Sequence, residues 1–194
     1  EQLVSLRAIP GLVVLRPADA NEVVEAYRLV MPLRHEPAVL ALSRQPLPTF
    51  DRAKYASAGG LARGAYVMAD APGGAPEIIL IASGSEVALI VDAYERLAER
   101  GVRARIVSMP SWDLFEHQPA SYREQVLPAA VTARLAVEQG SVLGWDRYVG
   151  PAGRVIGMKT FGASAPLKEL QRKFGFEPER VVAAAKQQLH HNRT

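Results

Sequence analysis

The chain has 194 residues, enough for one full domain or one and a half, but not for a large multidomain enzyme. Hydrophobic residues make up 48% and charged residues 22%, which excludes disorder and predicts an ordinary packed core. The net charge is only +3 and basic residues alternate with acidic ones, which argues against a nucleic-acid-binding surface. The lack of cysteine excludes disulfide frameworks, thiolate metal sites and cysteine nucleophiles.

No apolar stretch approaches the roughly 18 residues of a membrane span. The first residues, Glu1 to Val4, contain neither a signal-peptide core nor an initiator methionine. We therefore expect a cytoplasmic protein whose chain begins partway through a longer one.

Short apolar runs alternate with amphipathic stretches, a pattern that predicts βαβ units and a mainly parallel sheet. Residues 11–16 and 38–43 are predicted strands. Between them we expect a helix that begins after the N-cap Asp19, with Glu22 in the capping-box position, and ends at Pro32. The expected core face of this helix comprises Val23, Val24, Tyr27 and Val30. One such unit cannot bury its own faces, so a partner sheet must lie later in the chain or on preceding sequence.

Residues 46–62 carry two prolines and a Gly-Gly pair without apolar periodicity, which indicates a linker. The strands predicted beyond it are 64–68, 78–83, 105–109, 133–138 and 155–158. Helices are expected after Ser85 and over 122–127, 166–174 and 178–189. The fold class is therefore α/β: a three-layer α/β/α domain with a mostly parallel sheet of about five strands, preceded by the tail of a second α/β domain.

The helix after Ser85 has the clearest periodicity in the chain. Its expected core face is Val87, Ile90, Val91, Tyr94 and Leu97. We expect Ser85 to cap this helix and Ser164 to cap the helix over 166–174. The Gly84-Ser85 turn could cradle an anion, but a simple tight turn is the favoured interpretation, since no phosphate-binding glycine motif is present. Ser85 also lacks the second glycine of a nucleophile elbow.

Other polar and aromatic residues point to structure rather than chemistry. The four histidines, His35, His117, His190 and His191, show no ligand spacing, so we predict no metal site in this chain. Glu138 ends an apolar strand, where a buried, hydrogen-bonded or interface role is favoured over catalysis. Trp145 and Tyr148 are expected to form an aromatic contact with Phe161 in the core or at a subunit interface.

Arg44 is the most interesting single residue. It stands at the carboxyl end of a predicted parallel strand, where open α/β proteins place their ligands. A guanidinium there could bind a phosphate through two hydrogen bonds. From position alone, a structural salt bridge is an equally good interpretation.

A series of motifs in fixed order resembles the transketolase family. The motifs are LRAIP (6–10), RPAD (16–19), LSRQ (42–45), IASGSEV (81–87), VSMP (107–110), YREQVLP (122–128), YVG (148–150), FGASAP (161–166) and FGF (174–176). The first three are similar to the end of that family's pyrimidine-binding domain, and the others to its C-terminal domain. The resemblance divides the chain into residues 1–50, the C-terminal part of the pyrimidine-binding domain, a linker over 51–62, and the transketolase C-terminal domain over 63–194.

The resemblance implies a cytoplasmic enzyme of the pentose phosphate pathway that uses thiamine diphosphate with Mg or Ca. Such an enzyme transfers a two-carbon ketol group from a ketose phosphate to an aldose phosphate and works as a homodimer. The family's arginine in the Ser-Arg-Gln segment binds substrate phosphate, and Arg44 occupies that position. This raises the phosphate-binding interpretation of Arg44 above the structural one.

The resemblance also implies that much of the catalytic apparatus lies outside the chain. The family's Gly-Asp-Gly metal and diphosphate motif, its catalytic glutamate and its substrate-channel histidines belong to preceding sequence. We therefore expect no catalytic, cofactor-binding or metal-binding residue in this chain. The chain alone should be inactive and should require the missing N-terminal portion of the same enzyme.

Two alternatives stay open. One is a non-catalytic domain that serves only in dimerisation or regulation. The other is a related thiamine diphosphate enzyme: dihydroxyacetone synthase, deoxyxylulose-phosphate synthase or the β subunit of a 2-oxoacid dehydrogenase. The Ser-Arg-Gln segment and the Phe-Gly-x-Ser-Ala-Pro segment favour transketolase over the last two, whereas dihydroxyacetone synthase is not separated from it by these residues.

Overall fold

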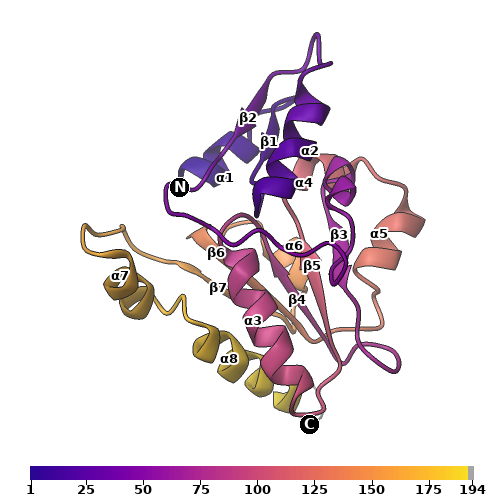
Figure 1. Cartoon of the computed structure of the whole chain (residues 1–194), viewed down its shortest axis with the longest axis vertical. Helices are drawn as coiled ribbons and strands as arrows, with labels where there is room; N and C mark the ends of the chain where they lie inside the picture. Colours follow the sequence, from indigo (N-terminus) through magenta and orange to yellow (C-terminus); the bar gives the residue numbers. More distant parts are fainter. Residues whose placement is uncertain (192–194) are drawn as a thin grey trace.

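The main body of the molecule is a five-stranded sheet, seen in a computed structural model that describes residues 1–191 (Figure 1). Its strand order is β3-β5-β4-β6-β7. The strands are β3 Tyr66–Ala69, β4 Ile78–Ala82, β5 Ala104–Ser108, β6 Arg134–Ser141 and β7 Arg154–Met158. All neighbours pair in parallel except β3, which runs antiparallel to β5 at one edge. The predicted α/β class with a mostly parallel five-stranded sheet is confirmed.

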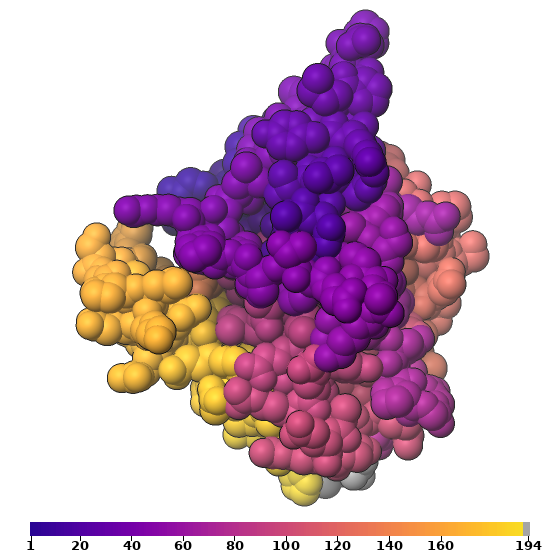
Figure 2. Space-filling model, viewed as in Figure 1, coloured from indigo at the N-terminus to yellow at the C-terminus, as the bar shows by residue number. Residues whose placement is uncertain are grey.

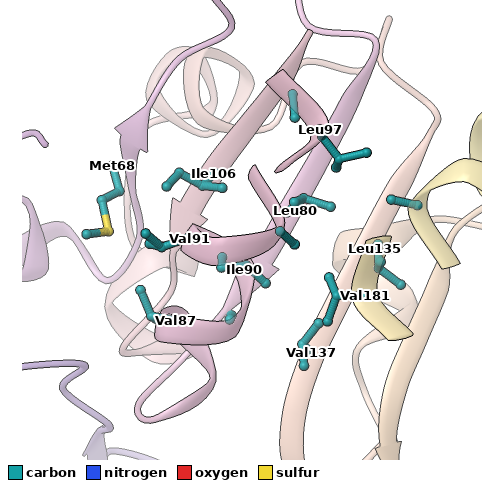
Figure 3. Close-up of a cluster of buried hydrophobic side chains, with 14 of the residues drawn as sticks. Met68, Leu80, Val87, Ile90, Val91, Leu97, Ile106, Leu135, Val137 and Val181 are labelled. Atoms are coloured by element: carbon teal, nitrogen blue, oxygen red, sulfur yellow. The ribbon is translucent and has the colours of Figure 1, made fainter. Parts of the chain in front are cut away.

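One face of the sheet is covered by α3 (Glu86–Ala98) and α8 (Pro178–His191). Val87, Ile90 and Leu97 of α3 are fully buried, as the periodicity predicts. Figure 3 shows these side chains directed at the sheet among Leu80, Ile106 and Leu135. All five residues of β4 are buried because helices cover the sheet on both sides.

The other face carries the short helices α4 (Trp112–Glu116), α5 (Ala120–Val126) and α6 (Asp146–Val149). Its core is aromatic, and the ring centroids of Trp145 and Tyr148 lie 5.9 Å apart. Phe161 takes no part in this cluster, contrary to the sequence prediction, because it lies in the irregular segment after β7 and is 87% exposed. Trp112 takes its place instead, with its ring centroid 5.0 Å from that of Trp145.

The N-terminal segment forms a smaller unit above the sheet (Figure 1). It consists of α1 (Gln2–Arg7), β1 (Val13–Leu15), α2 (Ala20–Val30) and β2 (Ala38–Leu40). The strands β1 and β2 pair in parallel. Asp19 is the N-cap of α2, as predicted, and its Oδ1 accepts a hydrogen bond from the Glu22 amide at 2.8 Å.

The predicted core face of α2 is wrong at Val24 and Tyr27, whereas Val30 packs against the core of the smaller unit as predicted. Val24 and Tyr27 are 50% and 49% exposed, whereas Glu22 and Ala26 are buried. The reason is that Glu22 hydrogen-bonds to β3 and to the last residue of β5, and these bonds turn its side of the helix toward the sheet. Apolar periodicity considers only hydrophobic residues, so it could not predict that the carboxylate of Glu22 is buried.

The segment between the two units is packed rather than loose. It contains the 3₁₀ helix η1 (Ala58–Arg63), in which Ala58 and Leu61 are buried. Before it, the rings of Phe50 and Tyr55 are buried in edge-to-face contact, with their centroids 5.9 Å apart.

The helix α7 (Leu167–Phe174) projects away from the sheet together with the loop before it (Figures 1 and 2). None of its residues is buried. The predicted Ser164 cap is wrong, because α7 begins after Pro166 and no side chain caps it. Ser85 likewise makes no capping hydrogen bond, since its hydroxyl donates to the Glu86 carboxylate instead. No helix among the described residues is long and apolar enough to cross a membrane.

Candidate functional site

Arg44 lies in the loop after β2, which ends at Leu40, at the carboxyl end of the parallel β1–β2 pair. Its side chain is exposed. Within residues 1–191 it makes no hydrogen bond or ion pair. A structural salt bridge, one of the two interpretations drawn from its position, is therefore absent among the described residues. The guanidinium is available to a ligand.

A second arginine lies at the end of the neighbouring strand. Arg16 follows β1 and enters the carboxyl ends of β4 and β6 in the main sheet. Its Nη1 donates to the Ser83 carbonyl at 2.9 Å and to the Glu86 carboxylate. The same nitrogen lies 3.7 Å from Glu138 Oε1. Only 9% of the Arg16 side chain and 1% of each carboxylate side chain is exposed.

Glu138 is the centre of this buried cluster. Arg7 of α1 donates two hydrogen bonds to its carboxylate, both at 2.7 Å. Ser83 and the Trp145 indole donate to it at 2.6 and 2.9 Å. The Arg7 guanidinium also lies over the Trp112 ring, 3.9 Å from its centroid. The buried, hydrogen-bonded role predicted for Glu138 is confirmed.

The turn at Gly84 receives the Arg16 side chain. Gly84 has a φ of +55°, and a Cβ there would come within 2.8 Å of the Arg16 side chain. The Gly84 amide donates to the Arg16 carbonyl at 2.9 Å. The tight-turn interpretation of this segment is therefore confirmed. The turn binds the Arg16 guanidinium through the Ser83 carbonyl and the Glu86 carboxylate.

The electrostatics of the cluster favour charged forms. Burial lowers the pKa of Arg16, but the opposing charges of Glu86 and Glu138 outweigh burial and raise it. Burial raises the pKa of Glu138, but the hydrogen bonds and charge of Arg7 and the charge of Arg16 bring it below its usual value. Both pKa shifts favour the charged form of the residue, and in the buried network the Arg16 guanidinium and the Glu138 carboxylate each face opposite charges.

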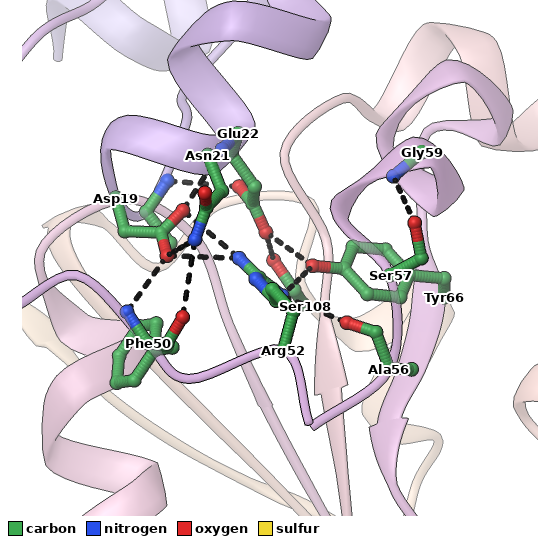
Figure 4. Close-up of polar contacts among 11 residues, drawn as sticks. Asp19, Asn21, Glu22, Phe50, Arg52, Ala56, Ser57, Gly59, Tyr66 and Ser108 are labelled. Carbon is green, nitrogen blue, oxygen red and sulfur yellow. Dashed lines mark hydrogen bonds and ion pairs between the residues drawn. The ribbon is translucent and has the colours of Figure 1, made fainter. Parts of the chain in front are cut away.

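A second polar cluster attaches α2 to the same sheet (Figure 4). Glu22 is fully buried and accepts hydrogen bonds from the hydroxyls of Tyr66 at 2.8 Å and Ser108 at 2.6 Å. Burial raises the pKa of the Glu22 carboxyl, although these hydrogen bonds act in the opposite direction. Beside it, Arg52 donates to both carboxylate oxygens of Asp19 at 2.9 Å. The N-terminal unit is thus joined to the sheet by two buried polar clusters.

Glu138 and Gly84 stand out in the sequence, but no sequence pattern brings them together with Arg7, Arg16 or Glu86. The missed signal is an arginine at the end of an apolar run, which Arg16 shares with Arg44. The histidines come together in no metal-binding group: within residues 1–191 no three His, Asp or Glu side chains could hold an ion.

Comparison with known proteins gives consistent results. A family model described as the transketolase-like C-terminal domain matches residues 64–177. Transketolase from Halalkalibacterium halodurans is 54% identical over 96% of this chain, and that from Geobacillus stearothermophilus is 50% identical over 96%. The chain spans 28% of the length of each. The solved structure of transketolase from Leishmania mexicana superposes with a TM-score of 0.88 at 40% identity, covering 98% of this chain and 27% of that one.

Proposed function

Because this chain belongs to the transketolase family through its C-terminal domain, we propose that it forms part of an enzyme that transfers a two-carbon ketol group from a ketose phosphate to an aldose phosphate. The relatives that support this proposal are more than three times as long as the chain. The reaction therefore belongs to a complete enzyme, by which we mean the transketolase that contains this chain.

Within that enzyme, Arg44 binds the phosphate group of a sugar substrate. The single observation that carries this role is an exposed guanidinium at the carboxyl end of a parallel strand pair, with no partner among residues 1–191. A planar guanidinium matches two phosphate oxygens and keeps its charge at all relevant pH values. Burying a guanidinium without a partner would cost free energy. Arg44 stays exposed to solvent, as expected of a group whose partner is supplied by a ligand.

The crevice beside the Gly84 turn does not fit the diphosphate of thiamine diphosphate. The amide of the Gly84 turn is already bonded to Arg16, and the crevice beside it is lined by the carboxylates of Glu86 and Glu138. These carboxylates would repel a diphosphate. The cofactor would be held by residues outside this chain.

The remaining features of the proposal follow from the family. The division into residues 1–50, 51–62 and 63–194, the homodimer, the pairing with an N-terminal portion and the cytoplasmic location are predictions. We assign sugar phosphates as the substrates and no nucleic acid or membrane as a partner.

The test is the Arg44→Ala variant of the complete enzyme, assayed with a phosphorylated donor sugar and with its unphosphorylated analogue. Loss of a charge-assisted bidentate contact of about 1.5–3 kcal/mol should raise KM for the phosphorylated sugar roughly tenfold to a hundredfold. KM for the unphosphorylated sugar should stay unchanged. The matched control is Arg34→Ala, since Arg34 is also exposed but lies before β2, at the opposite end of the strand.

Equal effects of Arg44→Ala on both sugars would contradict the phosphate-binding role. In that case a non-catalytic assembly domain would be the better description of this part of the chain.

A further inference from the structure

The loop that carries Arg44 is fastened only at its ends. At its start the Ala41 amide donates to the Leu15 carbonyl at 2.8 Å, and at its end the Phe50 amide donates to Asp19 Oδ2 at 3.0 Å. Among residues 1–191, none makes a hydrogen bond to residues 42–49. Leu15 and Asp19 lie on either side of Arg16 in the sequence. The position of Arg44 therefore depends on where residues 15–19 lie.

Arg16 fixes the first of those residues, whereas Asp19 is held by Arg52. The Arg16 amide donates to the Pro110 carbonyl at 2.8 Å, and its carbonyl accepts from the Gly84 amide at 2.9 Å. Its guanidinium is held by Ser83 and Glu86 in the crevice at the end of β4. Main chain and side chain of one residue thus attach β1 to the main sheet, and the loop after β2 is carried by β1.

We propose that Arg16 is a positioning residue for substrate phosphate binding: by joining β1 to the Gly84 turn, it sets the position of the loop that presents Arg44. The proposal rests on the proposed function, because it requires Arg44 to be the phosphate ligand. It also gives the C-terminal domain a part in the reaction, since Glu86 and Glu138 hold Arg16 although they lie far from it in the sequence.

Geometry makes Arg16 hard to replace by another cation. Nη1 reaches the Ser83 carbonyl, the Ser83 hydroxyl at 3.2 Å and the Glu86 carboxylate at once, and all three acceptors are buried. All three contacts come from this one nitrogen, and a lysine ammonium stands one bond nearer to the backbone than Nη1, so it keeps the charge but reaches the same acceptors only if the backbone moves toward them. The expected result is a shift of the backbone around residue 16. A displacement of about 1 Å at a ligand-binding group is enough to weaken binding.

The experiment measures KM and kcat for the Arg16→Lys variant of the complete enzyme with the same two sugars. We expect KM for the phosphorylated sugar to rise about threefold to tenfold, with kcat and KM for the unphosphorylated sugar nearly unchanged. In the Arg44→Ala background, Arg16→Lys should cause no further loss of preference for the phosphorylated sugar, because the two residues act on the same contact.

The matched control is Arg7→Lys. Arg7 is equally buried and binds the same Glu138 carboxylate, but it lies on α1, outside residues 15–19 that fasten the Arg44 loop. It should leave the preference for the phosphorylated sugar unchanged. If Arg16→Lys does not fold, Glu86→Gln serves as the second variant, since it keeps an acceptor for Arg16 and removes only the charge.

The outcomes separate the two ideas. If Arg44→Ala shows a phosphate-specific effect and both Arg16→Lys and Glu86→Gln show none, the positioning role is wrong and the proposed function stands. The positioning role is also wrong if Arg7→Lys has the same phosphate-specific effect as Arg16→Lys. If Arg44→Ala itself shows no phosphate-specific effect, both proposals are wrong.

Discussion

Gly84 shows how much of the architecture depends on a single residue. Its positive φ lets the chain turn sharply from β4 into α3, and its missing side chain leaves room for the Arg16 guanidinium. Both properties are needed at the same place. The glycine therefore serves the local turn and, at the same time, the contact between two units that lie far apart in the sequence.

The Gly84→Ala variant should be strongly destabilised. An alanine there adds backbone strain of about 1–2 kcal/mol and a Cβ within 2.8 Å of the buried Arg16 side chain. The matched control is Gly101→Ala, where φ is +74° but no atom lies within 4 Å of the added Cβ. In urea unfolding, Gly84→Ala should lose at least about 2 kcal/mol more than Gly101→Ala, since it also disturbs the buried ion pair. Equal losses would mean that the contact with Arg16 contributes nothing.

At the scale of elements, the joint between β1 and the main sheet is electrostatic. The ends of β1, β4 and β6 meet in a crevice where Arg16 faces Glu86 and Glu138. Two carboxylates this close would repel each other without the arginines, so the strand ends are held together by charges that only the folded chain brings near one another. The stability of this joint should depend on pH.

The Glu138→Gln variant tests that dependence. Because the pKa of Glu138 is lowered in the folded state, the stabilisation is fully present above the unfolded carboxyl value of about 4.3 and is lost as pH falls through the folded pKa. At pH 7 the variant should lose about 3–5 kcal/mol in urea unfolding, since Arg7 is left without its partner. The difference between the native chain and the variant should shrink as the pH is lowered below 4.3.

The control for this pH effect is Glu179→Gln. The pKa of Glu179 is also lowered, by its hydrogen bond from Arg96, but the pair is exposed. Its unfolding midpoint should match that of the native chain at both pH values. A pH dependence of the Glu138→Gln effect no larger than that of this control would contradict the buried network.

At the scale of the whole molecule, the described residues 1–191 form a supporting body that presents Arg44 for the proposed reaction. The purified chain should neither bind thiamine diphosphate with Mg²⁺ in calorimetry nor transfer a ketol group between sugar phosphates. The reason is that its sheet-end crevice is acidic and already filled by Arg16. The complete enzyme, measured in parallel, should do both. Measurable ketol transfer by the isolated chain would contradict the prediction.

Much of the fold was predictable because the main-sheet strands are nearly continuous apolar runs, as in β4, where both faces are covered. The five residues of α4 were missed because they complete little more than one helical turn and show no period. The reversed direction of β3 was equally hidden, since strand direction leaves no mark on residue type.

The candidate site was only half predictable. Arg44 was found from its place after a strand and from the family motif, whereas Arg16, in the same kind of place, was passed over. The two arginines differ in their surroundings. Arg16 is buried against Glu86 and Glu138, whereas Arg44 is exposed among the described residues. Such partners lie about 70 residues or more away, beyond the reach of any local pattern.

Arg16 occupies the crevice at which open α/β proteins usually bind a dissolved ligand. The C-terminal domain thus carries a tethered ligand of its own, supplied by the preceding part of the chain at an effective concentration that free cations in solution rarely reach. Because Arg16 belongs to the same chain, it occupies the crevice at every protein concentration. If the chain were cut at residue 63, Glu86 and Glu138 would face each other without a counter-ion. The opposite charges of Arg16 and these two carboxylates would then favour reassociation of the two pieces.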